Sequence, residues 1–334
     1  MLLIYSILPA ALLHNFPCSG VIFSLFLIKQ SDSYLSATFL CLAAIRYICC
    51  LTQQILNLLY TMKRFMKHPL GIIALLSVVL ITSCSKDSAE PDPSMGYIQL
   101  ASGFAAGTST HVEVYATDSA FTGYNKLYIL LKDSVTGKPV DNAAVLLNPM
   151  MAMMSMSHSS PKENPVSNIA VNHFFPCSVS FIMPSTAGTW TLGVQIQNLE
   201  NGKSGTASFT INVKDPFYAK MFSFKSLADN STTYFVGYAE PSKPIVGIND
   251  LELVIYKKES MMLFPADSSL SVMVTPEMPT MNHGSPNNVD PVHVINGHYK
   301  GKVNFTMTGL WRLNLKLKSG TTVVDSTHYI DLTF

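Results

Sequence analysis

The chain carries little charge: 13% of its 334 residues are Asp, Glu, Lys or Arg, and the formal net charge is +1. A protein that binds nucleic acid presents a clustered basic face, and the sequence has no such cluster. It also lacks a Gly-rich phosphate loop, a nucleophile-elbow motif and any repeated His–Asp spacing. We therefore expect no nucleic-acid partner and no enzymatic activity.

Cysteine is scarce beyond the first 84 residues. Four of the six cysteines lie within the first 50 residues, the fifth is Cys84, and only Cys177 follows. The later part of the chain therefore has no second thiol for an internal disulfide, and we expect Cys177 to be a small buried apolar residue. The same part is rich in Thr, Ser, Val, Gly, Asn and Pro, which is typical of extracytoplasmic all-β proteins.

Residues 62–83 have the features of a signal peptide. Basic residues Lys63, Arg64 and Lys67 precede the apolar run 70–80, and Ile81-Thr-Ser-Cys84 follows. The apolar run is shorter than the roughly 20 residues that a membrane-spanning helix needs. These features predict export from the cytoplasm.

The segment ending at Cys84 resembles the lipobox of bacterial lipoproteins, with an aliphatic residue three positions before the cysteine. This resemblance implies cleavage before Cys84, lipidation of Cys84 and attachment to a membrane. Residues 84–96 are similar to the acidic, flexible tether of lipoproteins from Bacteroidetes-type bacteria. We expect a lipid-anchored protein of the cell envelope, at the outer membrane.

Residues 1–61 are an apolar patchwork that precedes this signal peptide. Because a signal peptide belongs at the N-terminus, we expect that translation begins at Met62 and that the start was assigned too early. The alternative is a hydrophobic leader that is part of the protein.

One pattern occurs twice: Met, two residues, Met, one residue, His, one residue, Ser-Pro. The copies are residues 153–161 and 278–286, at an offset of 125 positions (283 − 158). Three further segments match between the two halves. These are 123–129 with 247–253, 179–183 with 303–307, and 188–194 with 309–315. The last pair aligns the two tryptophans, Trp190 and Trp311, which we expect to anchor the cores. Self-similarity over this length predicts a duplicated domain.

Each half alternates apolar and polar residues with the period of a β-strand. The predicted strands are 111–115, 126–131, 179–183, 190–196 and 207–213 in the first half, and 234–238, 251–256, 302–307, 311–317 and 325–332 in the second. No useful helical periodicity appears after residue 84. The sequence therefore predicts an all-β protein with two tandem immunoglobulin-like β-sandwiches, over residues 97–214 and 215–334.

The second half resembles a known family. Residues 278–317 combine Met-x-x-Met-x-His-Gly-Ser-Pro, Gly-His-Tyr-Lys-Gly and Phe-Thr-Met-Thr-Gly-Leu-Trp, and they look like the YtkA-like domain. That family, related to FixH-type proteins, implies a small extracytoplasmic β-sandwich associated with copper. The first half resembles it more loosely, because Ser159 stands in place of the Gly and residues 184–187 are inserted before Gly188.

Thioether sulfur is a soft ligand that prefers Cu(I), and imidazole suits either copper oxidation state. In an extended segment, residues two apart project to one face, so Met281 and His283 would converge without a helix. His173 and His298 each follow a motif His by 15 positions (173 − 158 and 298 − 283) and could add a third ligand. The candidate metal ligands are Met153, Met156, His158, His173, Met278, Met281, His283 and His298. Met183 and Met307 are further candidates, although core packing is the other interpretation of both.

Two functions follow from these observations. The first is a lipoprotein that binds copper as Cu(I) through the repeated motif, for buffering or for delivery to a copper-transfer protein. The alternative is a structural or adhesive surface lipoprotein whose tandem domains bind protein or glycan, with the methionines forming an adaptable docking patch.

Overall fold

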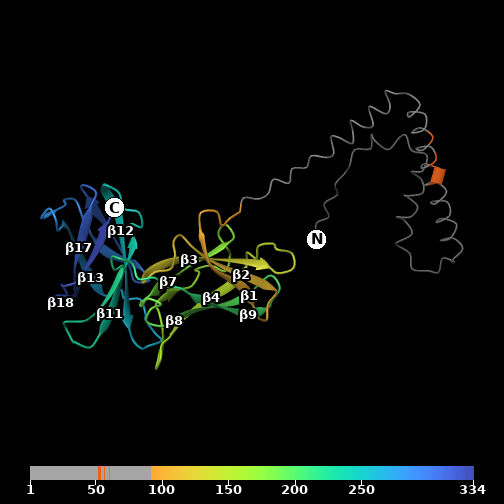
Figure 1. The fold of residues 1–334 in the computed structure, drawn as a ribbon, viewed down its shortest axis with the longest axis horizontal. Coiled ribbons are helices and arrows are strands. Elements are labelled where there is room, and N and C mark those ends of the chain that lie inside the picture. Colours follow the sequence, from red (N-terminus) through yellow and green to blue (C-terminus); the bar gives the residue numbers. More distant parts are fainter. Residues whose placement is uncertain (1–51, 54–55, 57–59, 61–91) are drawn as a thin grey trace, which may run out of the picture. The chain divides into compact units, whose positions relative to one another are not determined.

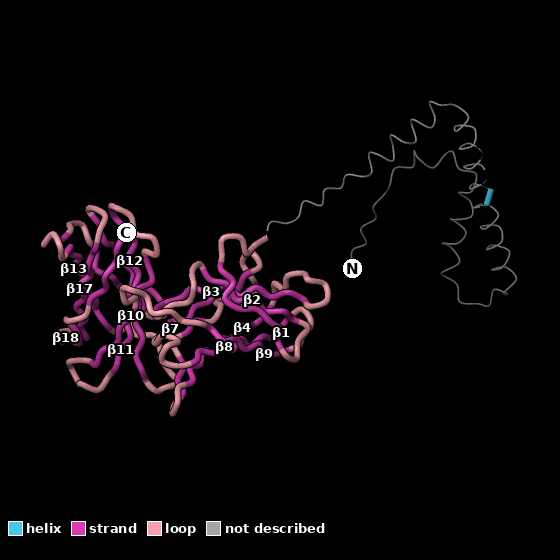
Figure 2. The backbone as a smooth tube through the Cα atoms, in the orientation of Figure 1, coloured by secondary structure: helices cyan, strands magenta, loops and turns pink. Residues whose placement is uncertain are grey.

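The structure is a computed structural model that describes residues 52–53, 56, 60 and 92–334. The chain from Pro91 to Phe334 forms one compact unit. From residue 92 onward the described chain consists of strands, turns and loops without a helix (Figure 2). The all-β prediction is thus confirmed. The predicted signal peptide and Cys84 lie outside the described residues. Within those residues, no helix is long and apolar enough to cross a membrane.

The first nine strands form one sandwich (Figure 1). They are β1 (Ile98–Ala105), β2 (Thr110–Ala116), β3 (Gly123–Asp133), β4 (Ala143–Ala152), β5 (Ser157–Ser159), β6 (Lys162–Glu163), β7 (Phe174–Phe181), β8 (Thr189–Asn198) and β9 (Ser204–Ile211). One sheet has the order β1-β2-β3-β7-β6 and the other the order β5-β4-β8-β9.

The other ten strands form a second sandwich. They are β10 (Met221–Lys225), β11 (Thr233–Glu240), β12 (Gly247–Lys258), β13 (Leu270–Met278), β14 (His283–Gly284), β15 (Val289–Ile295), β16 (His298–Phe305), β17 (Leu310–Ser319), β18 (Thr322–Asp325) and β19 (Tyr329–Thr333). Its sheets have the orders β10-β11-β12-β16-β15 and β14-β13-β17-β18, and β19 also pairs with β17. The two sandwiches therefore share a strand order. Evolutionary duplication stays a prediction.

Each sandwich has its own core, built by period-two alternation. In β8 the buried side chains are Trp190, Leu192, Val194 and Ile196, and in β17 they are Trp311, Leu313, Leu315 and Leu317. These rows pack against apolar residues of the facing sheet, because alternate strand residues point to the same face. Both tryptophans are fully buried, so their predicted role as core anchors is confirmed. Cys177 is buried and unpaired, as expected.

The same side-chain contact recurs at the start of β3 and of β12. The Asn125 amide nitrogen donates to the carbonyls of Phe121 and Gly123. In the second sandwich, Asn249 donates in the same way to Ile245 and Gly247. Each Gly has a positive φ, which lets the chain bend back onto the Asn side chain. The Gly-x-Asn triplet in the repeat thus has a local structural cause.

The predicted strand 325–332 is interrupted. β18 ends at Asp325 and β19 begins at Tyr329. The Asp325 carboxylate binds the Thr327 hydroxyl and lies 2.9 Å from Nδ1 of His328, which turns the chain between the two strands. The apolar alternation continues across the turn, so the pattern did not reveal it.

A small third cluster joins the two sandwiches. Tyr124 of β3 packs with Val254 and Tyr256 of β12 and with Phe264. Beside it, the Lys126 ammonium lies 2.5 Å from the Glu240 carboxylate. The predicted boundary at residues 214 and 215 falls between β9 and β10, and the folding of each half alone stays a prediction.

Candidate metal site

Each copy of the Met/His motif forms a hairpin. In the first sandwich β4 pairs with β5, and Met151 lies opposite His158. In the second, β13 pairs with β14, and Met278 lies opposite His283. The prediction of one continuous extended segment is wrong, because a turn separates the two strands in each copy. The antiparallel register, rather than spacing by two residues, brings a thioether side chain beside each imidazole.

The register also corrects the alignment of the two copies. Sequence matching equates Met153 with Met278, whereas the strands equate Met151 with Met278, at an offset of 127 (278 − 151). The pairing with the tryptophan strands supports this assignment. Met151 lies opposite Trp190, and Glu277, the residue before Met278, lies opposite Arg312, the residue after Trp311. Both turns have four residues, but the first hairpin has one more residue pair, Ala152 with Ser157, so Met151 is two residues farther from His158 than Met278 is from His283. The signal available in the sequence was the shared Pro-x-Met that ends β4 and β13.

The predicted thioether ligands fall into two groups. Met278 is buried, and Met153 packs half-buried against the core of the first sandwich. Met156 and Met281 lie in the two turns and are 51% and 59% exposed. Each hairpin therefore combines an inner methionine, Met151 or Met278, with an outer methionine in the turn. Methionine is common on adaptable binding surfaces, and the outer thioethers are accessible to a ligand.

The motif histidines share a packing arrangement. The His158 ring meets the Trp190 ring edge-on at 5.3 Å between centroids, and the His283 ring meets Trp311 at 5.8 Å. Each Nδ1 faces the carbonyl oxygen of the next residue, at 2.7 Å for His158 and 2.9 Å for His283. Because a carbonyl only accepts, each Nδ1 carries a proton, and Nε2 is then the ring nitrogen that can offer a lone pair.

Nε2 of His158 is a buried polar atom without a hydrogen-bond partner among the described residues. The residue is only 3% exposed. An unpaired buried polar atom costs about 1–3 kcal/mol, so proteins rarely retain one without a role. A soft metal ion is one partner that a neutral imidazole nitrogen can bind.

The two predicted third ligands are not brought to these hairpins. His173 precedes β7 and His298 begins β16, whereas the ends of these strands near the tryptophans are Phe181 and Phe305. Eight residues at about 3.3 Å each separate the two ends by more than 20 Å. His173 instead contacts Asp141, with both carboxylate oxygens 2.9 Å from Nδ1. Each of these histidines does follow a motif histidine by 15 residues, but it lies at the end of its strand that is far from the hairpin.

This geometry can be compared with known proteins. Residues 229–316 match the model of the YtkA-like family. The match covers β11–β17, including the hairpin of Met278 and His283, so the predicted resemblance is confirmed for this YtkA-like region. The first sandwich lies outside the match. No curated protein matches the chain.

Three solved structures align with parts of this chain at low similarity. Domains 5–6 of the S-layer protein SbsC align at 14% identity over 71% of this chain and 97% of that chain, with a TM-score of 0.23. A titin immunoglobulin tandem aligns at 10% identity over 64% and 90%, with a TM-score of 0.16. The FN1-FN3 domains of chicken CNTN1 align at 8% identity over 69% and 99%, with a TM-score of 0.15. The fold class rests on the strands described above rather than on these likenesses.

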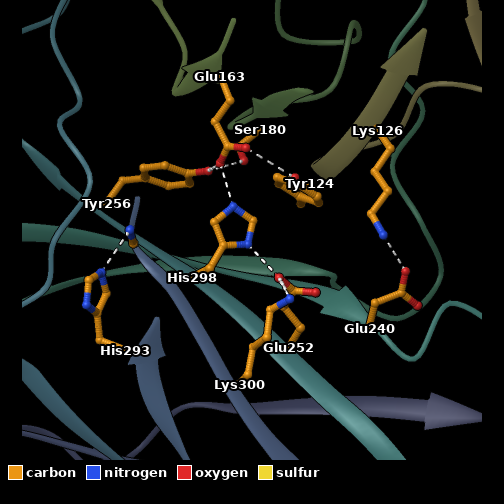
Figure 3. Close-up of polar contacts among 11 residues, drawn as sticks. Tyr124, Lys126, Glu163, Ser180, Glu240, Glu252, Tyr256, His293, His298 and Lys300 are labelled. Atoms are coloured by element: carbon orange, nitrogen blue, oxygen red, sulfur yellow. Dashed lines mark hydrogen bonds and ion pairs between the residues drawn. The ribbon is translucent and has the colours of Figure 1, made fainter. Parts of the chain in front are cut away.

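His298 of the YtkA-like region has a different environment from the motif histidines. It lies between two carboxylates: Nδ1 is 2.7 Å from Glu252, and Nε2 is 2.7 Å from Glu163 of the first sandwich (Figure 3). Glu163 also accepts hydrogen bonds from the hydroxyls of Tyr124 and Tyr256. Both ring nitrogens are therefore occupied. This arrangement is a polar link between the sandwiches, which we call the Glu163–His298–Glu252 link.

The link keeps His298 protonated at neutral pH. Burial alone would lower the pKa of His298, but hydrogen bonds to Glu163 and Glu252 and the attraction of their charges raise it to about 9. The same contact holds the pKa of Glu252 below its usual value. A protonated imidazole has no lone pair for a metal. His298 is thus unsuited to the ligand role predicted for it, and nothing in the sequence near Glu163 pointed to this contact.

We expect the stability of residues 91–334 to fall as the pH rises through about 9. The folded-state pKa of His298 lies above the value of about 6.5 in an unfolded chain. The stabilisation of the folded state by protonated His298 is therefore complete below about pH 6.5 and is lost as the pH rises through about 9. The titratable side chains around His298 are Glu163, Glu252, Lys300, Tyr124 and Tyr256. Burial raises the pKa of both tyrosines, so they stay neutral in this range.

Urea unfolding between about pH 6 and 10 measures this dependence. A His298→Leu variant is the control, because it should lack the part of the decline that His298 causes. Equal slopes in the two proteins would rule out His298 as the titrating group.

Among the described residues, no group of three or more His, Cys, Asp or Glu side chains could hold a metal ion. The donors that the hairpins do offer are thioethers and one imidazole each. Thioethers are soft ligands and imidazole is a borderline one, a set that suits softer metal ions rather than Mg²⁺.

Proposed function

We propose that this protein is an envelope lipoprotein that binds Cu(I) at its two Met/His hairpins and buffers it or delivers it to a partner protein. The observation that carries the proposal is the buried, unpaired Nε2 of His158 in a hairpin that also holds methionines. The match of residues 229–316 to the YtkA-like family, which is associated with copper, supports it. The lipobox-like segment at Cys84 supports attachment to the outer membrane.

The proposed ligands differ from those expected from the sequence. In the first hairpin they are Met156 and His158, with Met151 in place of Met153 on the inner side. In the second they are Met278, Met281 and His283. His173 and His298 are left out because carboxylates contact their ring nitrogens.

The chemistry of such a hairpin suits transfer more than permanent storage. The outer thioethers, Met156 and Met281, are exposed in turns, where they can first meet an ion or a partner's ligand. The histidine lies deeper, on the core tryptophan, and its tautomer is set by the carbonyl that Nδ1 faces. An outer soft ligand and an inner ligand whose orientation is fixed give the ion a path from the surface to the hairpin.

We expect the full chain, purified in detergent, to bind two Cu(I) ions in competition with a chromophoric Cu(I) chelator under reducing conditions. Combining Met281→Leu with His283→Ala should reduce this to one ion, because the first hairpin is unaffected. The matched control combines Met273→Leu with His293→Ala, which removes one exposed thioether of β13, five residues before Met278, and one exposed imidazole of β15. It should still bind two ions.

Unchanged stoichiometry in the hairpin variant would exclude the second hairpin as a copper site. Absence of Cu(I) binding by the unmodified chain would overturn the proposed function and favour the adhesive alternative.

A further inference from the structure

A loop of the second sandwich lies against the first hairpin. The backbone N–H of Ser159, in β5, donates to the carbonyl oxygen of Met261 at 2.8 Å. The loop holds its own shape, because the N–H groups of Glu259 and Ser260 both donate to the carbonyl of Leu263. The amide of Met262 donates to the Ser260 hydroxyl at 3.1 Å. We call residues 260–263 the methionine loop.

One backbone hydrogen bond joins the methionine loop to the edge strand β5 of the hairpin sheet. Segments joined by such a bond lie about 4.8 Å apart, so the backbone of Met261 lies about one strand spacing from Ser159. His158 is the residue before Ser159 in that strand. The Met261 side chain therefore starts close to the hairpin that contains the unpaired Nε2, and Met262 follows it in the loop.

The loop side chains are not accounted for by core packing. Met261 is 36% exposed, and Met262 and Leu263 are more than half exposed. Neither methionine belongs to a core cluster of the described residues. Methionine is unbranched and has three rotatable bonds, so it can turn toward a ligand with little strain.

We propose that the methionine loop supplies a thioether ligand to the first hairpin, so that this copper site is built from both sandwiches. The inference rests on the proposed function and adds a ligand from a segment outside the repeat. The second hairpin has no counterpart among the described residues, because its own β14 receives no such loop. The first site should therefore bind the ion more tightly than the second, by about tenfold, which corresponds to about 1.4 kcal/mol.

The Glu163–His298–Glu252 link favours such a shared site. Glu163 follows His158 by five positions, and its bond to His298 fixes the second sandwich near the same edge of the first. Ligands that are already held in place lose less freedom when an ion binds, so a rigid contact between the sandwiches raises the affinity of a site they share.

The test uses the full chain in detergent, labelled with carbon-13 on the methionine methyl groups, and Ag(I) as a redox-stable probe for a soft monovalent ion. We expect the methyl signals of the methionine loop to shift on addition of Ag(I), together with those of the hairpins. In a variant with Met261→Leu and Met262→Leu, the first site should bind Ag(I) about tenfold more weakly while the second is unchanged. Leucine preserves apolar volume, so the loop contact should persist.

The control is Met273→Leu, which removes a partly exposed thioether on β13. It should alter neither site. If the hairpin methyl signals shift but those of Met261 and Met262 do not, the first site is complete within its own sandwich and the inference is overturned, while the proposed function stands. If no methionine signal shifts, both are overturned.

Discussion

Replacing Trp311 with alanine is expected to lower the free energy of unfolding by about 4 kcal/mol. Trp311 is fully buried in the second core, where its ring packs on Phe305 at 5.4 Å between centroids. Its indole N–H donates to the Met307 carbonyl at 2.9 Å. Alanine removes both the packing and the hydrogen bond and leaves a cavity beneath the second hairpin. Urea unfolding followed by far-ultraviolet circular dichroism measures the change.

Two further variants make this result specific. Trp311→Phe retains most of the ring volume but loses the indole N–H, and we expect a smaller loss of about 1–2 kcal/mol. Val292→Ala, on the exposed edge strand β15, should change stability by no more than about 0.5 kcal/mol. A loss below about 2 kcal/mol for Trp311→Ala would mean that the second core collapses around the missing ring, contrary to the anchor role.

The second large effect is expected at the link between the sandwiches. His298→Leu should lower the free energy of unfolding by about 2–3 kcal/mol. It leaves the Glu163 and Glu252 carboxylates partly buried without the positive charge between them. This expected loss is smaller than the loss for breaking a fully buried ion pair, because His298, Glu163 and Glu252 all retain some contact with water. The matched control is Lys302→Met, which breaks an exposed ion pair with Asp250 and should cost less than about 1 kcal/mol.

A double-mutant cycle assigns the loss to the contact between sandwiches. Glu163→Gln and His298→Leu remove the same interaction from opposite sides, so the double variant should be less destabilised than the sum of the two single variants. A coupling of at least about 1 kcal/mol is expected in urea unfolding. Purely additive losses would mean that the two side chains stabilise their own sandwiches separately.

Much of the fold could be predicted because its causes are local. Alternation in 190–196 and 311–317 correctly identified the central strands and their buried faces. The Gly-x-Asn triplets matched because Asn125 and Asn249 bind backbone carbonyls only two and four residues away. The interrupted strand after Asp325 was missed, because the polar residues that make the turn do not disturb the apolar pattern on either side.

The candidate site could be predicted only in part. The repeat located His158 and His283 and the outer methionines, since each hairpin is short and its turn joins the two strands directly. It mispaired Met153 with Met278, because counting along the chain ignores the extra residue pair, Ala152 with Ser157, that lengthens the first hairpin. Met151 was identified only by the strand register, which aligns it with Trp190.

The all-β class, the two cores and the chemistry available in each hairpin could be predicted from the residues, because these features depend on side-chain type and on contacts between near neighbours in the chain. The role of His298 as a protonated link and the position of Met261 beside β5 are visible only in the folded chain. These contacts join residues 135 and 102 positions apart (298 − 163 and 261 − 159). They depend on how one sandwich packs on the other, and no local pattern encodes that packing.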